Sequence, residues 1–95
     1  MKISEITVNN VVEYLRLEDG EYNEAEIENL LNVAKQFVKS YTGLTEEEID
    51  KHEDFYIVVM ILCQDMYDNR SYYVDKNNLN KVVETILGMH SVNLL

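Results

Sequence analysis

Two histidines and one cysteine are the residues of this chain best suited to catalysis or metal binding. His52 and His90 lie 38 positions apart, and neither has a cysteine nearby in the sequence. Zinc ligands usually occur in closely spaced pairs, and no HExxH, CxxC, GxSxG or phosphate-loop pattern is present. We therefore interpret His52 and His90 as two ordinary surface histidines, and we expect no metal site and no catalytic residue.

Carboxylates are the other abundant reactive groups. Glu46, Glu47 and Glu48 are consecutive, so on a helix their side chains point in different directions. They are better suited to interact with the positive end of the helix dipole than to act together as a catalytic acid and base. The Glu18-Asp19-Gly20 turn lacks the alternating Asp and Asn ligands of a calcium loop. We expect no cofactor, and enzyme activity is disfavoured because no nucleophile stands beside a base.

Length and charge restrict the class of protein further. The 95 residues fit one domain, 1–95, and 46% hydrophobic residues are enough for a packed core. The net charge of −10 disfavours direct binding to nucleic acid or to an anionic membrane. The longest unbroken apolar run, 55–63, is too short to span a bilayer, and residues 1–10 do not resemble a signal peptide. We expect a soluble, unprocessed protein in a reducing compartment, where Cys63 stays free.

Hydrophobic spacing predicts an all-α fold with four main helices at about 8–16, 24–42, 54–70 and 78–88 and a short helix near 46–51. Thr7 is the expected N-cap of the first helix, while Asn23 with Glu26 and Thr45 with Glu48 match capping boxes. The glycines at 20, 43 and 88 fall where the pattern breaks, so each is expected to lie between helices or to end one.

The apolar run 55–63 is the ambiguous segment. Its β-branched residues are compatible with a buried strand, but Phe55, Val59, Leu62 and Met66 continue at helical spacing. A helix that is apolar on all sides requires neighbours on most of them. We therefore place the 54–70 helix at the centre of the bundle. Leu79, Val82, Val83, Ile86 and Leu87 predict the buried stripe of the last helix, capped near Asn77 or Asn78 and ended by Gly88.

Three groups of residues are candidates for surface contacts. Tyr67, Asp68, Asn69 and Arg70 close the central helix, where Arg70 is positioned to bond the last carbonyls and to reach an acid on a neighbouring element. Tyr72, Tyr73 and Val74 form an aromatic patch in a polar loop, which either folds back onto the core or contacts another subunit. Val92, Leu94 and Leu95 form an apolar tail, for which the same two alternatives remain open.

Three short segments resemble one known family. Residues 12–16 (VEYLR), 34–43 (AKQFVKSYTG) and 66–71 (MYDNRS) are similar in order and spacing to the small head-to-tail connector, or head-completion adaptor, proteins of long-tailed bacteriophages. The similarity spans nearly the whole chain and includes Arg16 and the aromatic-acidic-Asn-Arg signature at 67–70. The sequence departs from the family in having no Pro near the start of the last helix and no Arg after Arg70.

The resemblance implies a structural phage or prophage protein without catalysis. Copies of the chain would form a cyclic ring beneath the portal at the head–tail junction of the virion, after synthesis in the bacterial cytoplasm. The ring would extend the DNA channel, through which DNA passes without specific binding, and would dock the next head-completion or tail protein. The interface expected for these contacts is Tyr72, Tyr73 and Val74 together with the tail.

An acidic interaction protein is the main alternative. A phage DNA mimic, which occupies the basic cleft of a DNA-binding protein, would suit the net charge of −10. Acidity is concentrated in residues 1–54, which hold fourteen acids and five basic residues. Many of these acids, however, stand at expected helix starts, where capping already accounts for them. We therefore favour the connector over the mimic.

Overall fold

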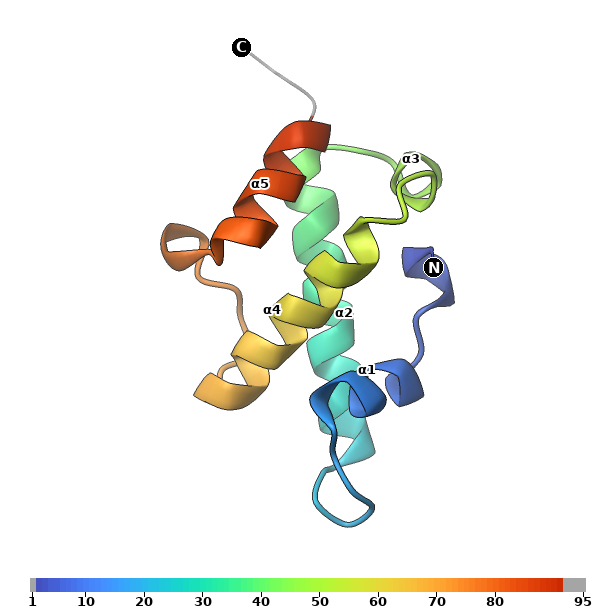
Figure 1. Cartoon of the computed structure of the whole chain (residues 1–95), viewed down its shortest axis with the longest axis vertical. Helices are drawn as coiled ribbons and strands as arrows, with labels where there is room; N and C mark the ends of the chain where they lie inside the picture. Colours follow the sequence, from blue (N-terminus) through green and yellow to red (C-terminus); the bar gives the residue numbers. More distant parts are fainter. Residues whose placement is uncertain (1, 92–95) are drawn as a thin grey trace.

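The apolar run at 55–63 is helical and central. In the computed structural model, which describes residues 2–91, it forms most of α4 (Phe55–Asn69). Phe55, Val58, Val59, Met60 and Cys63 are each fully shielded from solvent. α4 packs against α2 (Glu24–Thr42), α5 (Lys81–His90) and α1 (Val8–Leu15), so it has neighbours on most sides, as a helix without a polar face requires (Figure 1).

Three short elements complete the bundle: the 3-10 turns η1 (Ile3–Glu5) and η2 (Lys76–Asn78) and the helix α3 (Glu46–Asp50). Residues 2–91 contain no strand, so the all-α prediction is confirmed. η1 packs beside α3 and also contacts α4. In Figure 1, α4 crosses in front of α2, while α1 and α5 lie near opposite ends of α2. None of the helices in residues 2–91 combines the length and the apolarity needed to cross a membrane.

The predicted N-caps of the first three helices are confirmed, with one difference. The Thr7 hydroxyl accepts the Asn10 amide hydrogen, and Thr45 and Glu48 form the reciprocal capping box at α3. Asn23 accepts the amides of residues 25 and 26, but Glu26 makes no reciprocal bond. The carboxylate of Glu26 instead faces Arg70 of the α4 terminus.

The boundaries predicted for the last helix were wrong at both ends. η2 and α5 are separate because Leu79 is extended and Asn80 is not helical. Asn80, rather than Asn77 or Asn78, caps α5 by accepting the Val82 amide hydrogen at 2.8 Å. Gly88 lies inside α5, which continues to His90. The final turn is retained because the Ser91 hydroxyl donates to the Leu87 carbonyl and the His90 ring contacts Asp54.

Val82 also departs from the expected buried stripe, since half of it is exposed. α5 packs on α4 and α2 from the periphery of the bundle, and such a helix buries only one side. Val83 and Leu87 fill that side and are fully buried. Val82 and Met89 lie on the outward side of α5 and are 50% and 69% exposed.

Candidate interaction surface around residues 71–75

The end of α4 directs the following chain back along the bundle. Arg70 adopts the left-handed conformation (φ 52°), its amide donates to the Tyr67 carbonyl, and the Ser71 amide donates to the Met66 carbonyl. This is the Schellman pattern, which reverses a chain while satisfying the last carbonyls of a helix. The backbone amides therefore do the capping that the sequence analysis assigned to the Arg70 side chain. The segment that follows, residues 71–75, is called the 71–75 loop below.

Side-chain contacts of residues 67–70 hold this turn in place. The Arg70 guanidinium lies over the Tyr67 ring, 4.7 Å from its centroid, and its Nη1 is 3.8 Å from Glu26 Oε1 on α2. Asp68 accepts two 3.0 Å bonds from the Gln64 side-chain nitrogen one turn earlier. Tyr67, Asp68 and Arg70 thus have structural contacts at the end of α4. Arg16 closes α1 with the same left-handed geometry (φ 58°) but lines neither of the hollows described next.

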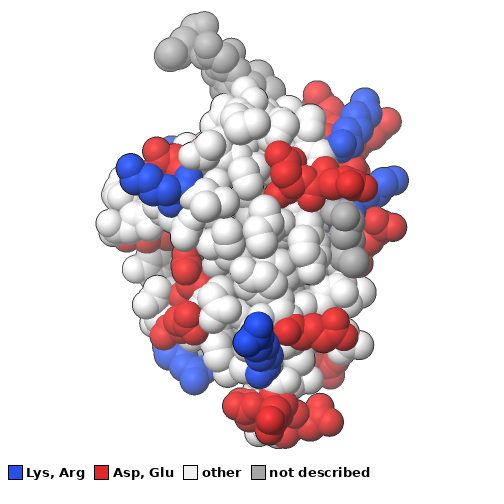
Figure 2. All heavy atoms as spheres, in the orientation of Figure 1, with Lys and Arg blue, Asp and Glu red and all other residues white. Residues whose placement is uncertain are grey.

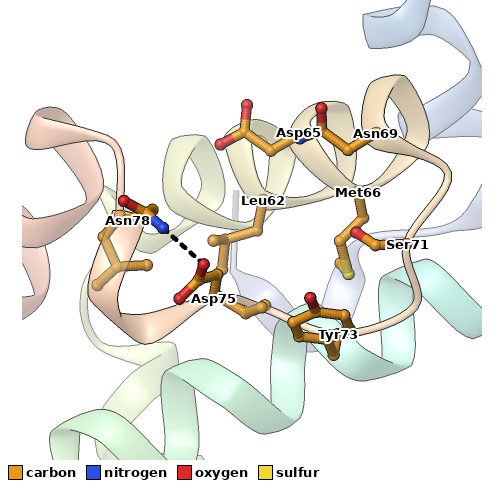
Figure 3. A pocket seen from close by; sticks show the side chains of 10 residues that line it. Leu62, Asp65, Met66, Asn69, Ser71, Tyr73, Asp75 and Asn78 are labelled. Atoms are coloured by element: carbon orange, nitrogen blue, oxygen red, sulfur yellow. Dashed lines mark hydrogen bonds between the residues drawn. The ribbon is translucent and has the colours of Figure 1, made fainter.

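Two hollows flank the 71–75 loop. The first, of about 350 Å³, lies between the loop and α4. Figure 3 shows Tyr73 and Asp75 on its loop side and Leu62, Asp65 and Met66 on its α4 side. The second, more open and of about 510 Å³, lies between the loop and the face of α2 that includes Val33 and Phe37. Tyr73 and Val74 line both hollows, so the loop forms a ridge between two depressions.

The structure separates the three candidate loop residues into two groups. Val74 is half-buried and packs against the core, so it folds back. Tyr72 and Tyr73 remain 58% and 67% exposed. The loop is anchored beyond Val74 by Asp75, which accepts the Asn77 amide and the Asn78 side-chain amide, and by Lys76, whose ammonium lies 5.8 Å from the Tyr41 ring centroid. The rings of Tyr72 and Tyr73 are therefore exposed to solvent on a loop that hydrogen bonds anchor at its C-terminal end.

The first hollow is electrostatically negative. Asp65 and Asp75 line it, and no Lys or Arg does. Partial burial and the neighbouring Asp68 carboxylate raise the pKa of Asp65 above its ordinary value. A polar or basic group of a partner would relieve both effects, because it would replace lost hydration and offset the charge.

Two residues of α5 extend the exposed apolar surface: Val82, which was expected to be buried, and Met89, which the sequence analysis did not name. Val82 and Met89 are seven positions apart, which places them on one side of the helix, and both are largely exposed. The sequence alone could have indicated this exposure. Five of the ten residues of α5 are apolar, which is more than one buried side of a helix can hold. The predicted tail contacts of Val92, Leu94 and Leu95 lie outside the described residues.

The residues considered for chemistry have two different environments. Cys63 is completely buried in α4, and this burial raises the pKa of its thiol to about 12, so the thiol stays protonated and is neither a nucleophile nor a ready metal ligand. His52 and His90, by contrast, are brought together, with ring centroids 4.0 Å apart. The interpretation of two unrelated surface histidines is therefore wrong as to their placement, because the packing of α5 beside the start of α4 closes the separation in sequence.

Charged side chains on the face shown in Figure 2 occur in separate groups, with uncharged surface between them. Several acids have structural partners: Asp50 accepts the Ser4 amide, Glu46 pairs with Lys39 at 3.6 Å, and Glu26 pairs with Arg70. An evenly spaced row of free carboxylates, which a DNA mimic needs, is not seen on this face.

Comparison of the chain with protein-family models, with curated proteins and with solved structures found no significant match.

Proposed function

We propose that this protein is a structural subunit that assembles with copies of itself into a ring, and that the ring is a head-to-tail connector of a long-tailed phage or prophage. The observation that carries the proposal is the ridge of Tyr72 and Tyr73, two largely exposed aromatic side chains between two hollows. Aromatic side chains on a fastened loop are favourable anchors for protein–protein contacts, because they bury a large area at little conformational cost.

The arrangement suits a head-to-tail contact between identical subunits. A ridge on one subunit needs a depression on its neighbour, and heterologous contacts of this kind close into a ring when the rotation between neighbours divides a full turn. The exposed side of α5, with Val82 and Met89, offers a second apolar surface on the same small molecule. A domain of this size gains stability from such partners, since it buries a limited fraction of its own surface.

The assignment to a phage connector rests on the three motif segments at 12–16, 34–43 and 66–71. In this proposal the ring sits under the portal, DNA passes through it without specific contacts, and the ring docks the next head-completion or tail protein. An acidic subunit repeated around a channel would repel the phosphate backbone and let DNA slide.

Assembly is tested by light scattering of the purified protein over a range of concentrations, alone and with portal protein. Wild type should form a cyclic oligomer, and Tyr73→Ser, with or without removal of the residues after His90, should weaken it. Tyr14→Ser is the matched control, because Tyr14 is an exposed tyrosine of α1 that lines neither hollow. A protein that stays monomeric under all these conditions contradicts the ring.

The connector role is tested separately by electron microscopy of a lysate from phage that lack the gene. Filled or leaking heads beside unattached tails are expected, and normal joined virions would refute the role. Salt-sensitive capture of a host DNA-binding protein, weakened by Glu24→Gln, Glu28→Gln and Glu46→Gln together, would favour the DNA mimic instead.

A further inference from the structure

His52, Asp54 and His90 form a compact cluster at the junction of three elements. His52 and Asp54 lie in the turn between α3 and α4, and His90 is the last residue of α5. One potential ligand atom from each side chain lies within 4.8 Å of the other two. All three side chains are partly buried, which limits their freedom without closing them to solvent.

The orientation of Asp54 points to this cluster rather than to helix capping. Asp54 occupies the N-cap position of α4, yet its side chain makes no capping hydrogen bond. Its Oδ2 lies instead 2.8 Å from His90 Nε2. A carboxylate that contacts an imidazole nitrogen in this way is placed either to orient the ring or to share a cation with it.

Phe55 holds the two imidazole rings in place. It is fully buried and meets both rings edge to face, with centroid separations of 5.5 Å to His52 and 5.2 Å to His90. The rings lie beside each other at 4.0 Å with 32° between their planes. Both histidines are therefore supported from the core side, while the cluster opens on a surface hollow.

The charge around the cluster favours a cation. Glu47, Asp50 and Glu53 line the same hollow as Asp54, and Lys2 and Lys51 are the basic residues that face them. The acids outnumber the lysines, so the local field attracts a divalent ion. Cys63 cannot compete for the ion, because it is buried in α4.

The geometry points to a site for a divalent transition metal of the zinc class, bound by His52, Asp54 and His90. Two imidazole nitrogens and one carboxylate oxygen are a ligand set that zinc uses, with a fourth position left to water. Tetrahedral ligands at the usual bond lengths lie about 3.3 Å apart. The 2.8 Å separation of Asp54 and His90 and the 4.8 Å limit of the cluster bracket that distance, so the three ligand atoms lie near the spacing that the site requires.

A metal bound here would cross-link the end of α5 to the start of α4. Binding to the folded state alone raises stability in proportion to the logarithm of metal concentration. Metal-stripped full-length protein is therefore titrated with ZnCl₂ and followed by calorimetry and by thermal unfolding. At zinc concentrations about a hundredfold above the dissociation constant, a rise of at least about 5 °C in Tm is expected.

Variants assign the ligands. His52→Gln, Asp54→Asn and His90→Gln should each weaken zinc binding at least about tenfold, whereas Glu53→Gln, which changes a charge in the same hollow without removing a ligand, should weaken it much less. Circular dichroism checks that each variant is folded. Equal affinity in the His52→Gln/His90→Gln double variant would show adventitious binding to carboxylates and overturn the site.

A measurement on the unaltered protein guards against variants that do not fold. His52 and His90 are the only histidines in the chain, so imidazole NMR signals report on the cluster directly. Stoichiometric zinc should shift the ring signals of both residues, and removal of the zinc with a chelator at the same pH should restore them. Absence of binding, or a shift confined to one ring, would mean that the cluster is only a His–Asp contact between α4 and α5.

Discussion

The guanidinium of Arg70 lies 3.8 Å from the carboxylate of Glu26, and this contact joins the C-terminal end of α4 to the first turn of α2. Both residues depart from the expected local structure. Glu26 makes no reciprocal capping bond at the start of α2, and Arg70 adopts a left-handed conformation that costs a residue with a side chain about 1 kcal/mol. Arg16 adopts the same conformation at the end of α1.

The two arginines should therefore respond differently to glycine. Arg16→Gly should raise the free energy of unfolding by about 0.5–1 kcal/mol, because glycine removes the backbone strain at the end of α1. Arg70→Gly should raise the free energy of unfolding much less, because this variant also loses the ion pair with Glu26 and the stacking on Tyr67. Each of these contacts contributes up to about 1 kcal/mol. Urea unfolding of both variants provides the measurement. An equal gain from the two would mean that the Arg70 side chain contributes nothing to stability.

Buried and exposed apolar positions should tolerate charge very differently. Leu31→Asp and Val59→Asp each bury an unpaired carboxylate, at a cost above about 4 kcal/mol that approaches the whole stability of a small domain. Both variants should lose their helical circular dichroism. Val82→Asp is the control, and because Val82 is half exposed it should change stability by no more than about 0.5 kcal/mol. Unfolding of the Val82 variant would contradict the placement of α5.

Asp50 should stabilise the fold above the ordinary pKa of its carboxyl group. Its Oδ1 accepts the Ser4 amide at 3.1 Å, which ties η1 to α3, and the Ser4 hydroxyl and amide lower the pKa of Asp50. A lowered pKa in the folded state means that the stabilisation is present above the ordinary value of 3.8 and is lost as pH falls through the folded value. Asp50→Asn should thus be less stable than wild type at neutral pH, by at most about 1 kcal/mol after solvent screening.

The Asp50 difference should shrink as the pH is lowered below 3.8, and urea midpoints across this range test the sign. Glu47→Gln, in the same short helix, is the control for removing one negative charge. A difference between Asp50→Asn and wild type that is constant with pH would exclude the carboxylate as its source.

Asp65 should have the opposite pH dependence. Burial, together with Asp68, raises its pKa in the folded state, so its contribution is favourable while it is protonated and is lost as pH rises through that pKa. Asp65→Asn should therefore raise the Tm slightly at neutral pH and leave it unchanged in acid. Glu84→Gln, an exposed acid on α5, serves as the control, and a larger gain from Glu84→Gln would mean that general charge repulsion, rather than the hollow, is responsible.

Helix positions followed from local chemistry, and so were predictable. Thr7, Asn23 and Thr45 cap helices by accepting hydrogen bonds from amides two or three residues away. The apolar spacing that predicts α2 and α4 likewise depends only on residues within each helix. Gly43 ends α2 in the left-handed conformation for the same local reason. The sequence thus determined the all-α class and the central place of α4, whereas it left open whether the aromatic residues at 72 and 73 fold back onto the core.

Tertiary packing decided which distant side chains meet. α5 lies beside α4, and this places His90 against Asp54 and His52, although the sequence separates them by more than thirty residues. The same packing buries Val83 and exposes Val82, while the packing of α4 against α2 brings Arg70 to Glu26. Hydrophobic spacing specifies that a helix has an apolar side, but only the direction from which its neighbours approach determines which residues on that side lose contact with water.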